Sequence, residues 1–122
     1  LPTQFQAQGS PNPMDELETF LYHVVPQNQW DSRFDGTRYD TPDRPETGFI
    51  HLSYRHQIKA TVTRHFLDRT DLLVLKVDPR RLPALQCEDL YGHGEFPHHY
   101  GPIDADAIVD KRPWIGADPF GN

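Results

Sequence analysis

The sequence predicts a single α+β domain, and three observations carry this prediction. Several short β-prone runs are separated by connections rich in proline and glycine, of which the chain has 12 and 8. Only one long segment follows a helical period. Strands and helices do not alternate in the βαβ order of a parallel, doubly wound sheet, and no glycine-rich nucleotide-binding motif occurs.

The length of 122 residues suits one hydrophobic core and not two. Residues 1–16 are polar, rich in Gln, Pro and Gly, and without a strand or helix period, so we expect a flexible tail or a non-native remnant. The predicted domain then covers residues 17–115, and residues 116–122 form a short C-terminal tail.

The first part of the domain is predicted to contain two strands and a short helix. Thr19–Val25 is a compact β-prone run. Gln27–Phe34 is expected to form a short helix with Trp30 as its core anchor, and Gly36–Tyr39 a short strand. Thr41–Thr47 holds two prolines and several charges, which indicates a loop.

The next strand leads into the main helix. In Gly48–Ser53, alternation places Phe49, His51 and Ser53 on one side. Ser53 has the position and the residue type of a helix N-cap, and residues 54–67 follow a helical period.

The second half is predicted to be mainly β. Asp71–Val77 is nearly continuous in apolar residues, which favours a central strand, and Asp78–Leu82 should turn the chain. Leu85–Leu90 is a predicted edge strand and Ala107–Lys111 a last short strand. Between them, Tyr91–Pro102 is dense in Gly, His, Pro and aromatic residues and indicates a rigid loop.

Composition narrows the class of partner. The net charge of −6 argues against nonspecific DNA binding, which needs clustered Lys and Arg, although a local basic pocket could hold a small anion. A single cysteine, Cys87, allows no internal disulfide, and no run approaches the length of a membrane span. The expectation is a cytoplasmic protein that binds neither DNA nor membrane, with its oligomeric state open.

Two histidines in predicted strands are candidate site residues. His23 and His51 are both flanked by apolar residues, so both are expected to be partly buried on a sheet. One interpretation is that each is packed with a backbone partner. The other is that both side chains face one cleft.

The segment Phe96–Pro102 is the second candidate. An aromatic ring, imidazoles and a phenol in a rigid loop can stack on a planar ligand and hydrogen-bond to it; the alternative is a tight corner fastened by Tyr100. The spacing of His93, His98 and His99 matches no strong zinc motif, so no metal is expected.

Three motifs together resemble a known family. They are L-Y-H-V-V followed by Trp30, G-F-I-H-L-S followed by Gln57, and F-P-H-H-Y-G-P preceded by Glu88. Over roughly residues 19–111 the chain is similar to the domain-of-unknown-function 952 family. That resemblance implies an ADP-ribosyltransferase-like fold, which is a split, mainly antiparallel sheet with one main helix and a central cleft that takes NAD as substrate.

The resemblance also implies roles for individual residues. By position, His23, His51 and Glu88 would be the catalytic group. The expected ligand-binding residues are Ser53, Phe96, His98 and Tyr100. Two functions stay open: an enzyme that cleaves NAD or transfers ADP-ribosyl groups, and a non-catalytic module that binds a nucleotide-like ligand or a protein.

Overall fold

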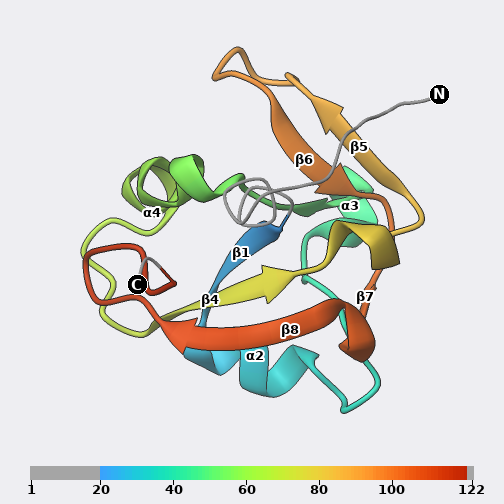
Figure 1. The fold of residues 1–122 in the computed structure, drawn as a ribbon, viewed down its shortest axis with the longest axis horizontal. Coiled ribbons are helices and arrows are strands. Elements are labelled where there is room, and N and C mark those ends of the chain that lie inside the picture. Colours follow the sequence, from blue (N-terminus) through green and yellow to red (C-terminus); the bar gives the residue numbers. More distant parts are fainter. Residues whose placement is uncertain (1–19, 121–122) are drawn as a thin grey trace, which may run out of the picture.

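A three-stranded antiparallel sheet forms the centre of the fold in the computed structural model, which describes residues 20–120 (Figure 1). Its strands, in spatial order, are β1 (Leu21–Pro26), β4 (Leu72–Val77) and β8 (Ile108–Pro113). The apolar run predicted to be a central strand is β4, and that prediction is confirmed. Alternate residues of β1 and β4 enter two different hydrophobic clusters, so this sheet is covered on both faces.

A second antiparallel sheet carries most of the polar candidates. Its order is β3 (Ile50–His51), β6 (Phe96–His99) and β5 (Leu85–Glu88), and the predicted edge strand is indeed at its edge. An antiparallel bridge between Tyr22 and Ser53 joins this sheet to β1. A two-stranded pair, β2 (Arg38–Tyr39) with β7 (Ile103–Asp104), completes the β structure of the described residues.

The helices are short. They are α2 (Gln27–Arg33), α3 (Arg44–Thr47), α4 (Ile58–His65) and three single turns of 3₁₀ helix: η1 (Arg55–Gln57), η2 (Pro79–Arg81) and η3 (Ala105–Ala107). Both α2 and α4 contact β1. Trp30 is 9% exposed and stacks on Phe34, which confirms its predicted role as the anchor of α2. The chain is thus α+β with antiparallel sheets, as predicted.

Two predictions of local structure are wrong. The segment 41–47 is not all loop, because α3 forms there, with a proline at a position in its first turn where no amide donor is needed. Phe96–Pro102 is not a loop throughout, since β6 is the middle strand of its sheet and all four of its residues are buried. Its proline, Pro97, lies beyond the residues that β6 pairs with β3, and its carbonyl still accepts from the amide of Leu52 at 2.9 Å, so a proline is compatible with this position.

Residues after position 115, the predicted end of the domain, also pack against the domain. Trp114 and Phe120 pack against the cluster around Tyr22, and Arg55 pairs with Asp118 at 2.6 Å. The predicted N-terminal tail at 1–16 and the last two residues lie outside the described residues. Within the described range, no helix has the length and apolar character needed to cross a membrane.

Candidate functional site

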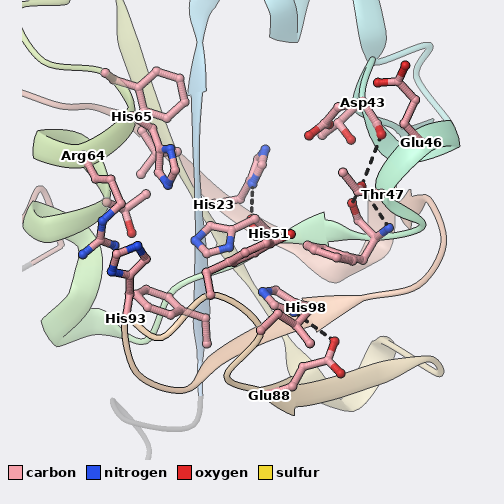
Figure 2. Close-up of a pocket in the computed structure, with 18 of the residues that line it drawn as sticks. His23, Asp43, Glu46, Thr47, His51, Arg64, His65, Glu88, His93 and His98 are labelled. Atoms are coloured by element: carbon pink, nitrogen blue, oxygen red, sulfur yellow. Dashed lines mark hydrogen bonds and ion pairs between the residues drawn. The ribbon is translucent and has the colours of Figure 1, made fainter.

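A cavity of about 770 Å³ opens between β1, the second sheet, α4 and the α3 segment (Figure 2). This volume lies in the range of small-molecule sites. The chain brings five kinds of lining group together: histidines, aromatic rings, carboxylates, threonines and one arginine. The lining includes His23, Asp43, Glu46, Phe49, His51, Arg64, His65, Glu88, Tyr91, His93, Phe96 and His98.

His23 lines the cavity with both ring nitrogens engaged. Nδ1 lies 2.7 Å from the carbonyl oxygen of His51, and Nε2 lies 2.9 Å from the hydroxyl of Tyr39. A carbonyl only accepts, so Nδ1 carries the proton and Nε2 accepts from Tyr39, which in turn accepts from Gln29 at 3.0 Å. Burial lowers the pKa of His23 to about 4, and this histidine is therefore neutral at pH 7.

His51 is half-buried, and its Nε2 has no hydrogen-bond partner among the described residues. Burial, followed by charge repulsion from His98, His23 and His65 in their protonated forms, lowers its pKa to about 3. The ring is thus held neutral, with one nitrogen as donor and the other as acceptor. It contacts Phe96 and His98, at centroid distances of 5.0 and 5.4 Å.

His98 combines an engaged nitrogen with a free one. Its Nδ1 lies 3.0 Å from Oε1 of Glu88, which also accepts a hydrogen bond from the hydroxyl of Tyr100. These two bonds, that of Tyr100 first, lower the pKa of Glu88, which is therefore an acceptor, so Nδ1 of His98 is protonated. Nε2 is buried without a partner. Phe49 stacks on the ring at 4.1 Å and fixes its plane.

The two ends of the cavity differ in charge. Figure 2 shows Arg64, His65 and His93 together on one side, while Asp43 and Glu46 lie on the other side, beside α3. Burial, then Arg64 and His93, lowers the pKa of His65. One end can therefore hold an anionic group, and the other end can accept hydrogen bonds from hydroxyl, amide or ammonium donors.

Sequence reasoning missed these two ends. Arg64 lies in the predicted helix at 54–67, and Asp43 and Glu46 lie in the segment 41–47 that the sequence predicts to be a loop. Their sequence spacing carries no signal, because only tertiary folding brings α3, α4 and the β5–β6 connection around one cavity. The buried Thr41, whose Oγ1 lacks a partner, was missed for the same reason.

The predicted site residues divide into two groups. His23, His51, Glu88, Phe96 and His98 all line the cavity. Ser53 does not: it is 1% exposed, and its Oγ lies 2.8 Å from Oγ1 of Thr61. It is not the helix N-cap either. The helical turn begins at Arg55, so its N-cap is Tyr54, and the amide of Tyr54 donates to the side chain of Gln57.

Tyr100 is also outside the lining. Its ring is 40% exposed and packs edge-on against Phe49, while its hydroxyl is engaged by Glu88. The strand β6 ends at His99, so Tyr100 follows the strand and is not among the residues that line the cavity. Its hydroxyl supports Glu88, which does line the cavity. No set of three metal-ligating side chains is arranged around one point in the described residues.

Comparisons with known proteins extend this description. The model of the family described as "Protein of unknown function (DUF952)" matches residues 24–111. The crystal structure of protein CC0527 from Caulobacter crescentus is similar, with a TM-score of 0.71 and 27% identity over 82% of this chain and 90% of that chain. The solution structure of CC0527 gives a TM-score of 0.67 and 27% identity, over 78% and 84%. No curated protein matches the chain. The family match spans well over half of the sequence, and the chain belongs to the DUF952 family of proteins of unknown function.

Proposed function

We propose that the cavity binds NAD or another ADP-ribosyl or nucleotide-like compound, and that the protein cleaves it or transfers the ADP-ribosyl group. The observation that carries the proposal is the pair of adjacent histidines, His51 and His98, each with a buried Nε2 that lacks a partner. Unpaired buried polar atoms are costly, and they are expected where a ligand completes the hydrogen bonds.

The chemistry of the lining suits the parts of such a ligand. Ribose hydroxyls both donate and accept, which matches a neutral imidazole, and Phe96 and Tyr91 offer flat surfaces for a base. The cavity carries more carboxylates than guanidinium groups, so the phosphates would have to lie at the end formed by Arg64, His65 and His93.

In this proposal His23 is a supporting residue. Both of its nitrogens are engaged, so it has none left for the ribose contact that the family resemblance implies. Its bond to the carbonyl of His51 fixes β3 instead, and His51 takes the ribose contact. A cavity between two antiparallel sheets is also the arrangement that an ADP-ribosyltransferase-like fold implies, and we include that fold in the proposal.

A non-catalytic binding module is the second candidate, and the position of Glu88 favours it. Cleavage of the nicotinamide–ribose bond passes through an oxocarbenium-like state that a nearby carboxylate would stabilise. Oε1 of Glu88 is already shared by His98 and Tyr100, and Figure 2 shows His98 between Glu88 and His51. A ligand could then bind without reacting.

A thermal-shift screen of the full chain with NAD, ADP-ribose and AMP tests the proposal. A ligand at about 100 times its Kd should stabilise the protein by roughly 2.7 kcal/mol. His51→Ala should abolish the shift. His56→Ala, at an exposed position outside the cavity lining, is the matched control and should keep it.

Absence of a shift with every nucleotide would overturn both candidates as nucleotide binders. A shift without nicotinamide release from NAD would select the binding module over the enzyme.

A further inference from the structure

The hydrogen bonds around His98 resemble those of a positioned base more than those of a structural histidine. His98 is 1% exposed, and its Nδ1 donates to Oε1 of Glu88 at 3.0 Å. The hydroxyl of Tyr100 donates to the same oxygen. The tyrosine holds the carboxylate from one side while the carboxylate holds the imidazole. Figure 2 shows the ring between Glu88 and His51, and His98 is among the residues that line the cavity.

Two of the other cavity histidines, His23 and His51, are less suited to take up a proton. Both nitrogens of His23 are engaged. The His51 ring has no hydrogen bond to a described residue, so no carboxylate would balance its charge after protonation. Of His23, His51 and His98, only His98 has both an unpartnered Nε2 and an anionic partner on the opposite nitrogen.

We propose that His98 is the general base of the cavity, with Glu88 and Tyr100 as its positioning residues, and that the acceptor it activates is a hydroxyl, either water or an alcohol. This inference rests on the proposed function, and it replaces direct charge stabilisation by Glu88 with an indirect role. Imidazole is a suitable base for water and alcohols in an attacking step, whereas a guanidinium acceptor requires a much stronger one.

The step balances without any further reactant. The acceptor oxygen forms a bond to the anomeric carbon of the ribose that carries nicotinamide. The bond from this carbon to the ring nitrogen breaks, and its electron pair leaves with nicotinamide, which becomes neutral. The acceptor proton moves to Nε2 of His98, the carboxylate of Glu88 stabilises the resulting imidazolium, and the proton later passes to solvent.

The test combines three variants of the full chain, His98→Gln, Glu88→Gln and the double variant, with nicotinamide release from NAD in water as the readout. For His98→Gln we expect kcat to fall by about 10²- to 10⁴-fold, the usual range for loss of a general base. For Glu88→Gln we expect a fall of about 10- to 100-fold, by analogy with other orienting partners of histidines. KM for NAD should change by less than about threefold, since in this inference Nε2 of His98 contacts the acceptor hydroxyl and not NAD.

The double variant separates positioning from direct catalysis. If Glu88 acts through His98, the double variant should be no slower than His98→Gln alone. If the two losses multiply, Glu88 acts on the substrate directly and the proposal is overturned. Nitrogen-15 NMR of wild-type histidines gives a readout independent of activity, and His98 should appear as the Nδ1–H tautomer with an unprotonated Nε2. An Nε2–H tautomer also overturns the proposal.

The remaining outcomes separate this inference from the function on which it rests. A wild-type protein that binds no nucleotide refutes the proposed function and the base with it. A protein that binds NAD but releases no nicotinamide, or one in which His98→Gln retains wild-type turnover, leaves the binding proposal intact and refutes the base. If His98→Gln does not fold, Glu88→Gln alone decides, because unchanged turnover in that variant is incompatible with a positioned base.

Discussion

The two three-stranded sheets use the same antiparallel pairing for different purposes. In the sheet β1-β4-β8, the central strand is almost wholly apolar and both faces are covered. In the sheet β3-β6-β5, the middle strand carries two adjacent buried histidines, and its neighbour β5 is mostly exposed. Burial of apolar side chains stabilises the first sheet. The second sheet buries imidazole nitrogens without hydrogen-bond partners, which lowers the stability of the fold.

The two sheets also differ in the number of buried polar side-chain atoms that lack a hydrogen-bond partner. Among the described residues, five buried side-chain atoms lack partners, and three of them are the Nε2 atoms of His51, His98 and His99 on β3 and β6. His23 lies on the first sheet, in contrast, and has both nitrogens bonded. Native structures satisfy nearly all such groups. The second sheet holds most of these exceptions, and two of its three, on His51 and His98, line the cavity.

The largest expected effect is on the first sheet. Leu75 is fully buried in β4, and Leu75→Ala should lower the free energy of unfolding by about 2–5 kcal/mol through lost burial and a residual cavity. Gln86→Ala changes an exposed residue of β5, opposite His98 in the register, and should alter it by less than about 0.5 kcal/mol. Denaturant unfolding of both variants measures the contrast. Equal losses would show that the second sheet contributes to stability as much as the first.

Acid should destabilise the protein through the neutral histidines. The folded-state pKa values of His23 and His51 are about 4 and about 3, against an ordinary 6.5. Above pH 6.5 both are neutral in either state, and this stability is fully present. As the pH falls from 6.5 toward 4, the unfolded chain takes up protons that the folded chain does not. The free energy of unfolding should then drop by about 1.4 kcal/mol per pH unit for each histidine.

A variant shows how much of this pH dependence of the unfolding free energy comes from His23. His23→Gln removes one of the groups whose pKa is lowered, so the dependence of its unfolding free energy on pH between 6.5 and 4 should be less steep by about 1.4 kcal/mol per pH unit, once carboxylate titration below pH 5 is fitted separately. Denaturant unfolding at half-unit pH steps measures the slope. A slope equal to that of the wild type would show that His23 is protonated in the folded state.

The sequence predicted the first sheet better than the second, and the reason is physical. An apolar run such as that of β4 reports burial directly, and the anchor role of Trp30 follows in the same way. β6 was missed because Pro97 and adjacent histidines are not typical of a middle strand. That strand exists because tertiary pairing with β3 and β5 outweighs local preference.

For the candidate site too, the sequence predicted some residues correctly and could not predict others. Motifs located His51, Phe96 and His98 on the cavity lining, where the structure has them. Local pattern could not reveal that Glu88 lies behind His98 or that Tyr100 faces away from the cavity, since both depend on the register of β5 against β6. It also could not exclude Ser53, whose hydroxyl is bonded to Thr61 across a helix that begins later than expected.

The smallest expected effect concerns the edge of the second sheet. The hydroxyl of Tyr100 is the largest cause of the lowered pKa of Glu88, ahead of His98. Tyr100→Phe removes that donor, so the pKa of Glu88 should rise toward its ordinary value, while the bond from His98 keeps it from reaching that value. Carbon-13 NMR of the glutamate carboxyls from pH 2 to 7 measures the change. Tyr91→Phe, at a more exposed tyrosine, is the matched control and should leave the Glu88 titration in place. An unchanged Glu88 titration in Tyr100→Phe would mean that Tyr100 only packs against Phe49. His98 would then be held by its hydrogen bond to Glu88 alone, without the second bond from Tyr100 to Glu88.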